Sequence, residues 1–266
     1  SRLKKGLTLG YKGGGGVNPF QKHQIEHLSP SSLNIYAEQP AFWALKYLHG
    51  YKDEGNPYAW RGSAVEAGLD HFLFKRDEGA AQKAGLDRFE LEALGLCDDE
   101  TDRERQLISP MLSLVMEQLA DKPEPTVRQL AVEFWFDGIE VPVIGKIDYE
   151  WPEEGLELKT ATRMPSQIPG RHARQISLYQ AARKKPYRLL YTTAKKVEFK
   201  ALLPHEAEQH LKHLAWHAHA VRRVLSMFSD KHDLARIFVP DFQSFYWKRE
   251  EARAKAMEIW ECQLQL

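Results

Sequence analysis

The fold is decided by residues 143–179, VIGKIDYEWPEEGLELKTATRMPSQIPGRHARQISLY. Two apolar-rich segments flank the turn signal Pro152-Glu153-Glu154-Gly155, and this pattern predicts a β-hairpin. We expect Trp151 to pair with Leu156. Because side chains alternate along a strand, that register puts four charged side chains on one face of the sheet. They are Asp148, Glu150, Glu157 and Lys159.

The expected register brings like and unlike charges together. Asp148 lies opposite Lys159, with Glu157 as its diagonal neighbour at roughly 7–8 Å. Glu150 lies opposite Glu157, an unfavourable arrangement unless a cation separates the two carboxylates. A face that carries three carboxylates and an ammonium therefore indicates a metal site. The alternative, which spacing alone leaves open, is a solvated face with an ordinary cross-strand ion pair.

Carboxylate oxygens are hard ligands that suit Mg²⁺ or Mn²⁺, and these ions bind through a few carboxylates together with water and substrate phosphate. A metal held in this way can activate water near neutral pH. A neighbouring lysine can hold the attacking water or stabilise charge that develops in the transition state.

The hairpin resembles a known signature. Asp148 followed by Glu157-Leu158-Lys159 resembles the PD-(D/E)xK nuclease motif, with residues 145–148 (GKID) in place of its Pro-Asp. Residues 175–179 (QISLY) resemble the Q-x-x-x-Y motif of the RecB-like and phage (lambda-type) exonuclease branch.

Two upstream fragments fit the same family. Residues 28–33 (LSPSSL), followed by Tyr36 and Gln39-Pro40, resemble its opening helix. Residues 61–66 (RGSAVE) resemble its G-x-x-x-H/E motif. The four fragments occur in the family's order between residues 28 and 200.

The resemblance implies an α/β fold of the restriction-endonuclease-like class, with a central mixed β-sheet flanked by helices and helical additions at both ends. It implies that Asp148 and Glu157 are the principal metal ligands, completed by Glu66 and the backbone carbonyl of Leu158. Lys159 would be the charged catalytic group. Gln175 and Tyr179, one turn apart on a helix, would orient water, lysine or phosphate.

Several residues around this site are expected to contact DNA. Arg171 and Arg174 lie near the start of the helix expected over 171–184, and helix amino termini and arginines both favour phosphate. Hydroxyl groups supply the other candidates. They are Thr160, Thr162, Ser31 and Ser32, although a serine at 29 or 31 can also cap the helix expected to begin near Ser32.

Net charge is zero with histidines neutral, so a nucleic-acid-binding protein of this composition must separate its charges into patches. Residues 98–104 form an acidic segment. A basic segment surrounds the expected site and comprises Arg171, Arg174, Arg183, Lys184, Lys185, Lys195, Lys196 and Lys200. The alternative for each run is a solvated surface.

The 266 residues suffice for one domain, and we expect an N-terminal extension over 1–27 with a glycine run at 13–16, followed by a single nuclease domain over 28–266. No run of about 18 apolar residues predicts a membrane span, and no signal peptide is evident. The two cysteines, Cys97 and Cys262, cannot form a four-cysteine iron–sulfur site. We expect a cytoplasmic protein, in the host cytoplasm if it is phage-encoded.

The remaining pattern predicts helices over 59–74 and 204–228, helices over 79–121 with breaks near Gly95 and Pro110, and a final helix to Trp260. Strands are expected at 129–136, 141–151, 156–161, 187–192 and 197–203. Histidines at 210, 213 and 217 leave a zinc site as a weak alternative, because one straight helix cannot easily surround a tetrahedral ion.

The expected function is hydrolysis of DNA phosphodiester bonds that depends on one or two Mg²⁺ or Mn²⁺ ions, without an iron–sulfur cluster. An exonuclease that processes DNA ends in recombination or repair, of phage derivation, is the favoured form. The alternatives are a structure- or site-selective endonuclease and a catalytically inactive DNA-binding module, and RNA remains open as a substrate. The expected partners are DNA and either a second copy of the chain or a recombination protein, with no membrane.

Overall fold

The structure is a computed structural model that describes residues 18–261. The chain forms two compact units, which are described separately. Unit 1 comprises Ser1–Lys52, Glu133–Ile144 and Lys212–Leu266, and unit 2 comprises Asp53–Val132 and Gly145–Leu211. The glycine run expected at 13–16 lies outside the described residues.

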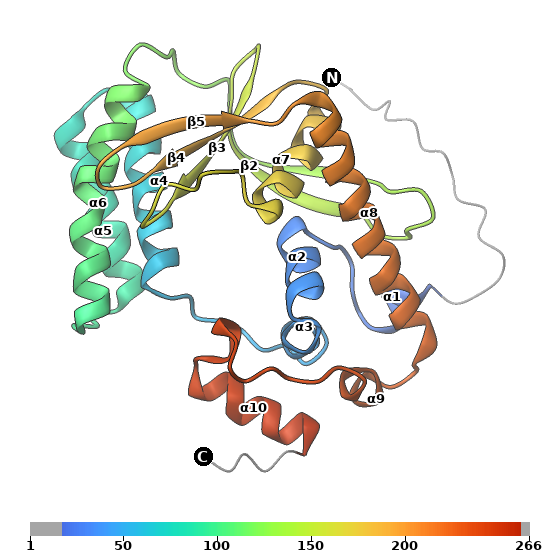
Figure 1. Cartoon of the computed structure of the whole chain (residues 1–266). Helices are drawn as coiled ribbons and strands as arrows, with labels where there is room; N and C mark the ends of the chain where they lie inside the picture. The colour runs from blue at the N-terminus through green and yellow to red at the C-terminus, as the bar shows by residue number, and fades with distance from the viewer. Residues whose placement is uncertain (1–17, 262–266) are drawn as a thin grey trace, which may run out of the picture. The chain divides into compact units, whose positions relative to one another are not determined.

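A five-stranded mixed sheet contains the hairpin predicted from the sequence (Figure 1). Its strands lie in sequence order, with β2 and β3 antiparallel, β3 and β4 parallel, and β4 and β5 antiparallel. They are β1 (Val127–Phe134), β2 (Val143–Glu150), β3 (Gly155–Thr160), β4 (Tyr187–Thr192) and β5 (Val197–Ala201). The prediction of a mixed sheet flanked by helices is confirmed.

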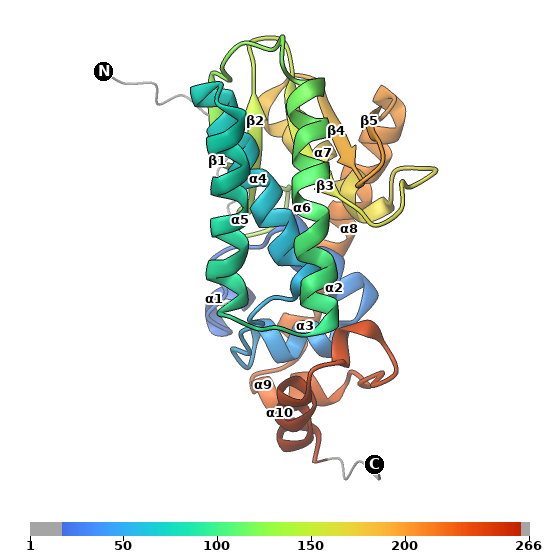
Figure 2. The same ribbon diagram turned by 90° about the vertical axis from the view of Figure 1, so that its left-hand side faces the viewer.

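Three helices of unit 2 lie side by side (Figure 2): α4 (Pro57–Lys75), α5 (Glu78–Ala93) and α6 (Asp99–Gln118). Their apolar faces bury one face of the sheet, where Leu158 and Leu190 join Leu69 and Leu112 in the core. Close packing depends on Gly68, because a Cβ there would lie 2.3 Å from a methyl carbon of Leu112.

The helix α7 (Gly170–Arg183) connects the parallel strands β3 and β4 and covers the opposite face of the sheet. Leu156 and Leu158 point toward the core formed with α4–α6, so Glu157 and Lys159, which alternate with them, point toward α7. The charged face of the hairpin is therefore covered by α7, which the sequence predicts over residues 171–184.

One predicted helix break is wrong. Helices α5 and α6 are separated near Gly95, as expected, but α6 continues through Pro110. Proline removes one backbone donor and leaves the carbonyl four residues earlier without its helical partner. Pro110 and Gln106 are both exposed, so water can satisfy that carbonyl and the helix persists.

Unit 1 is mainly helical. It contains α1 (Pro19–Lys22), α2 (Pro30–Glu38), α3 (Pro40–Tyr47), α9 (Lys231–Arg236), η1 (Phe245–Trp247) and α10 (Glu250–Trp260), together with most of α8 (Pro204–Met227). The C-terminal aromatics pack on α3, with the rings of Phe42 and Trp247 centred 5.2 Å apart and nearly perpendicular. The aromatic residues of α3 are thus core residues.

The predicted register of the β2–β3 hairpin is wrong by two residues. Tyr149 pairs with Leu156, and Glu150 pairs with Gly155. Trp151 belongs to the turn instead, where its backbone N–H donates to the carbonyl of Glu154 at 2.8 Å. A Cβ at position 155 would lie 2.1 Å from the ring of Tyr187, so a glycine must occupy this place in the strand. Gly155 thus makes room for Tyr187 of β4, whose hydroxyl donates to Glu150 of β2 at 2.6 Å, a contact that the sequence pattern does not reveal.

A shift of two residues leaves every side chain on its predicted face. It changes the neighbours, because continuing the observed register puts Asp148 opposite Glu157 rather than opposite Lys159. Like charges that face each other directly are unfavourable without an intervening cation. In this register Asp148 and Glu157, and not Glu150, are the carboxylates that a cation would have to separate.

Candidate active site

The strands β2 and β3 depart from regular pairing at Asp148. One carboxylate oxygen of this residue, Oδ2, accepts a hydrogen bond from the backbone N–H of Leu158 at 2.8 Å. In regular strand pairing a backbone carbonyl of the neighbouring strand accepts such a hydrogen bond. Here the side chain of Asp148 accepts it instead. The bond fixes the Asp148 carboxylate between the two strands and leaves its other oxygen to a further partner.

Glu157 is the best-defined member of the site. Its Oε1 accepts hydrogen bonds from the ammonium of Lys159 and from the side-chain amide of Gln175, each at 2.7 Å. Its Oε2 is buried and has no hydrogen-bond partner among the described residues. Since a buried polar atom without a partner is unfavourable, this oxygen marks a position for a ligand.

Gln175 and Tyr179 lie on α7 as predicted, and they contact each other as well as the hairpin. The amide of Gln175 donates to the hydroxyl of Tyr179 at 2.8 Å, and that hydroxyl donates to the carbonyl of Lys146 at 2.8 Å. The ring of Tyr179 lies over Gly145, where a Cβ would approach it to 2.4 Å. The glycine of the GKID sequence therefore admits the aromatic ring that supports Gln175.

Glu66, on α4, is brought to the same site. A cavity of about 200 Å³ is lined by Gly62, Glu66, Leu158, Lys159 and Thr160. The carboxylate of Glu66 accepts a hydrogen bond from the amide of Gln129, a residue of β1. The backbone carbonyl of Glu66 also accepts one from the hydroxyl of Tyr149, at 3.2 Å.

The three carboxylates are held where water compensates their charge poorly. Burial, followed by the charges of Glu157 and Glu66, raises the pKa of Asp148 well above its ordinary value. Burial also raises the pKa of Glu157 and that of Glu66. Burial alone would lower the pKa of Lys159, but the carboxylates of Glu157 and Asp148 raise it, so the side chain is an ammonium at neutral pH.

This donor set suits a hard divalent cation. Across residues 18–261 no group of three or more histidine, cysteine, aspartate or glutamate side chains lies close enough together to hold a metal ion, and this applies to the histidines of α8 and to the three carboxylates of the site alike. Magnesium keeps several water ligands and needs only one or two carboxylates from the protein. The partnerless oxygen of Glu157 and the carboxylate of Asp148 are two such ligands. A cation bound there would offset the unfavourable free energy of burying both negative charges.

Glu150 is engaged elsewhere. Its carboxylate accepts hydrogen bonds from Arg183 through two nitrogens, each at 2.8 Å, from Lys185 at 2.8 Å and from the hydroxyl of Tyr187 at 2.6 Å. The bond from Arg183 is the largest of the effects that lower its pKa to about 2. Both oxygens are saturated, so Glu150 joins α7 to the sheet and does not face a metal.

The predicted DNA contacts are only partly brought together. Thr160 lines the cavity, whereas Thr162 is exposed in the connection that follows β3. Arg171 and Arg174 lie in the first two turns of α7. In unit 1, Ser31 is exposed, while Ser32 is buried in a capping box with Ser29, so its hydroxyl has a structural role in α2.

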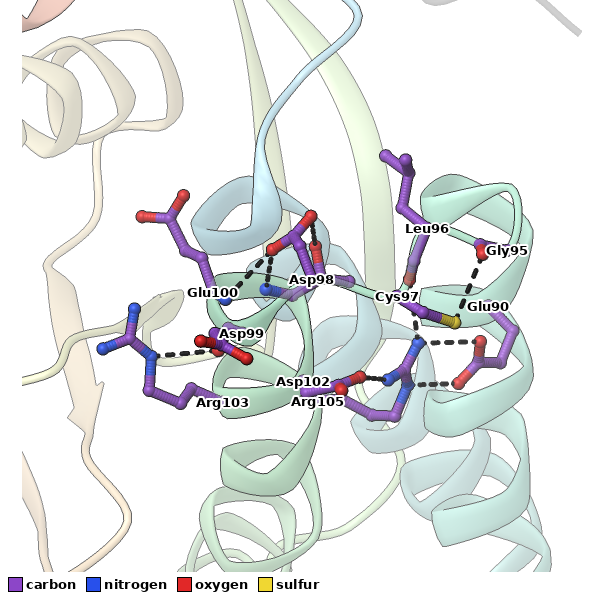
Figure 3. A network of polar contacts seen from close by, with 11 residues as sticks. Glu90, Gly95, Leu96, Cys97, Asp98, Asp99, Glu100, Asp102, Arg103 and Arg105 are labelled. Carbon is purple, nitrogen blue, oxygen red and sulfur yellow. Dashed lines mark hydrogen bonds and ion pairs between the residues drawn. The ribbon is translucent and has the colours of Figure 1, made fainter.

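Part of each charged segment is engaged in hydrogen bonds and ion pairs within the protein. Figure 3 shows that Asp98 caps the start of α6 through the backbone N–H groups of Glu100 and Thr101, and that Arg105 contacts Asp102 and Glu90. In the basic segment, Arg183 and Lys185 hold Glu150, while Lys196 and Lys200 contact Glu198.

Three polar contacts near the site were missed by sequence reasoning. Gln129 holds Glu66, as described above. The ring of His172 contacts the hydroxyl of Tyr191 at 2.7 Å, and burial, followed by the charge of Lys159, lowers the pKa of this histidine to about 3. Arg61 is buried against Glu104 and also reaches Thr160 at 3.4 Å. None of these pairs has a regular spacing along the chain, so no local pattern signals them.

Comparison with known proteins agrees with this arrangement. The sequence matches the PD-(D/E)XK nuclease superfamily over residues 27–256, and the chain belongs to this superfamily. Its fold is similar to the crystal structure of a "putative exonuclease" from Eubacterium rectale, with a TM-score of 0.54 and 14% sequence identity over 79% of this chain and 85% of that chain. No protein of curated function matches the sequence.

The chain is therefore a member of a nuclease superfamily. Among residues 18–261 no helix is long and apolar enough to cross a membrane.

Proposed function

We propose that this protein is a divalent-metal-dependent deoxyribonuclease that degrades DNA from its ends. The observation that supports the proposal most strongly is the buried, partnerless Oε2 of Glu157, beside Asp148 and within a site that also holds Lys159. An inactive binding module has no reason to retain a carboxylate oxygen in the interior without a partner, because such an atom lowers stability.

Each residue of the site has a separate expected role. Asp148 and Glu157 would hold the ion, and Glu66 and the carbonyl of Leu158 would complete its protein ligands. A bound Mg²⁺ or Mn²⁺ lowers the pKa of water and neutralises charge on the phosphoryl group. Lys159, whose side-chain nitrogen donates to Glu157 at 2.7 Å, would contribute positive charge toward the reacting phosphate.

Gln175 and Tyr179 keep Glu157 in its orientation. The amide of Gln175 donates to Oε1 of that carboxylate, so Oε2 is the oxygen that remains for the ion. The hydroxyl of Tyr179 accepts a hydrogen bond from the same amide and donates one to the backbone carbonyl of Lys146. Loss of either side chain is expected to let the carboxylate rotate.

DNA is held by its phosphates. Thr160 lies at the cavity and Thr162 follows it, while Arg171 and Arg174 belong to the start of α7. Ser31 is a further candidate in unit 1; Ser32 is not, since its hydroxyl caps α2. Because cations on the protein release counterions from DNA, binding is expected to weaken as salt rises.

Preference for DNA ends is supported by the Gln175–Tyr179 pattern, which resembles that of phage exonucleases, and by the description of the Eubacterium rectale protein. A role in recombination or repair, phage derivation, a second copy or a recombination protein as partner, and a cytoplasmic location belong to the same proposal. So does a single nuclease domain over residues 28–266, with the helical segments of unit 1 as additions to the catalytic core.

Two substrates of identical sequence test the proposal: a linear duplex and a covalently closed circle, each incubated with protein and Mg²⁺ or Mn²⁺. An exonuclease shortens the linear DNA progressively and leaves the circle intact. Asp148→Asn serves as the control for contaminating nuclease, since it lacks a principal ligand.

The possible results separate the candidate functions. Nicking or linearisation of the circle at a comparable rate would replace the exonuclease by an endonuclease with the same site. Retention of DNA without cleavage of either substrate would indicate a binding module and overturn the proposal. Parallel reactions with RNA of the same sequence show whether the protein cleaves DNA, RNA or both.

A further inference from the structure

The backbone of Gln129 is unusual for a strand. Six non-glycine residues between 18 and 261 have a positive φ. Four of them end helices α4, α5, α7 and α10, and Gln24 closes the turn after α1. Gln129, at φ +51°, is the one inside a β-strand within the described range. A side chain with a Cβ is strained in this conformation, and such strain persists where other contacts require it.

The strained position changes where two neighbouring side chains point. Consecutive residues of a regular strand face opposite sides of the sheet. Arg128 and Gln129 nevertheless both contact α4, because Arg128 pairs with Asp70 at 3.0 Å and Gln129 donates to Glu66. A left-handed residue re-aims a side chain in this way at a β-bulge. The strain therefore serves to bring the amide of Gln129 to Glu66.

The two contacts differ in charge. Asp70 and Glu66 lie one turn apart on α4, and each accepts a hydrogen bond from β1. Asp70 receives a guanidinium, which neutralises it. Glu66 receives a neutral amide, which fixes its orientation and leaves its negative charge in place. Glu66 is the one that lines the cavity with Lys159 and Thr160.

We propose that Gln129 is a positioning residue of the metal site, which orients Glu66 toward the ion without neutralising it. The inference rests on the proposed function, because Glu66 has a ligand to receive only if the cavity binds a cation. It adds a residue outside the family-like motifs, on the strand β1, to the groups that determine metal affinity. Partners that orient a ligand in this way typically change metal affinity about 10–100-fold when they are removed.

Three substitutions at one position test the assignment. Gln129→Ala removes the amide and retains the strain, whereas Gln129→Gly removes both, since glycine adopts a positive φ freely. Gln129→Lys keeps a donor for Glu66 but brings a positive charge. The readouts are Mn²⁺ affinity by calorimetry, unfolding of the metal-free protein by urea, and degradation of linear duplex DNA. Arg128→Ala is the matched control, because it removes the neighbouring contact to α4.

All three variants at position 129 are expected to bind Mn²⁺ about 10–100-fold more weakly than the wild type, while Arg128→Ala binds it unchanged. Without metal, Gln129→Gly is expected to be more stable than Gln129→Ala, because relief of strain accompanies the loss of the amide. If Gln129 only linked β1 to α4 through this hydrogen bond, Gln129→Lys would keep the bond. That variant should then bind Mn²⁺ with wild-type affinity.

The outcomes are separable. Wild-type affinity for Mn²⁺ in Gln129→Lys and Gln129→Ala overturns the positioning role and leaves the proposed nuclease intact. Gln129→Gly less stable than Gln129→Ala overturns the strain argument. A wild-type protein that binds no Mn²⁺ and cleaves no DNA overturns the proposed function, and the role of Gln129 is overturned with it.

Discussion

Replacing Glu150 by glutamine separates the charged residues that build the fold from those that hold the ion. The carboxylate is buried and accepts bonds from Arg183, Lys185 and Tyr187. Glu150→Gln keeps the shape and removes the charge, so two cations lose their common partner. Asp148 and Glu157, on the same face of the hairpin, are untouched.

The structure gives the size of the effect. Bonds from Arg183 and its neighbours hold the pKa of Glu150 at about 2, against 4.5 for an ordinary glutamate. A shift of this size corresponds to about 3 kcal/mol of folding free energy. Because Arg183 and Lys185 are partly exposed, solvent screening reduces the expected loss to about 2 kcal/mol.

The dependence on pH follows from the sign of the shift. The pKa in the folded state lies below that of the unfolded chain, so the stabilisation is complete above the unfolded value of 4.5 and is lost as pH falls toward 2. The difference in unfolding free energy between wild type and Glu150→Gln should therefore be constant near neutral pH and should shrink below pH 4.5.

Urea unfolding followed by tryptophan fluorescence, at pH 7 and at pH 4 or lower, measures this difference. Glu153→Gln, at an exposed position in the same turn, controls for loss of a surface charge. Equal stability of Glu150→Gln and wild type at pH 7, or a difference that does not change with pH, would refute the reasoning. Loss of Mn²⁺ binding in Glu150→Gln would show that this residue is a ligand after all.

Two further substitutions probe the site and its support. Lys159→Ala removes a charge but no ligand, so turnover on linear DNA should fall about 10²–10³-fold while Mn²⁺ affinity is largely kept; equal loss of both in Lys159→Ala and Glu157→Gln would contradict this division of roles. Gly145→Ala introduces a Cβ at 2.4 Å from the ring of Tyr179 and should destabilise the protein by about 1–3 kcal/mol, measured by urea unfolding. An unchanged midpoint would mean that the ring can move away at little cost.

The sequence predicts the fold well because its signals are local. The alternation of residues 141–151 and 156–161 and the helical period of residues 59–74 each lie within one strand or helix. The observed elements differ from the predicted ones by only a few residues. Asp148, Glu157 and Lys159 could be found because the family motif places them a few residues apart on one hairpin.

What could not be predicted depends on contacts between distant segments. Near the hairpin turn, Gly155 lies against the ring of Tyr187, 32 positions later in the sequence. Glu150 is acidic and lies on the same face as Asp148, and its contacts with Arg183, Lys185 and Tyr187 distinguish it. Gln129 has a backbone conformation that glutamine rarely adopts, at φ +51°, so no propensity predicts it.

Titration of the metal-free protein with Mn²⁺ in a calorimeter shows whether Asp148 and Glu157 share a divalent ion. We expect saturable binding to the wild type and to Glu153→Gln. Asp148→Asn should lose that binding, because the remaining carboxylates cannot replace a ligand fixed between two strands. Identical titration curves for the wild type and Asp148→Asn, or no binding to either, would contradict it.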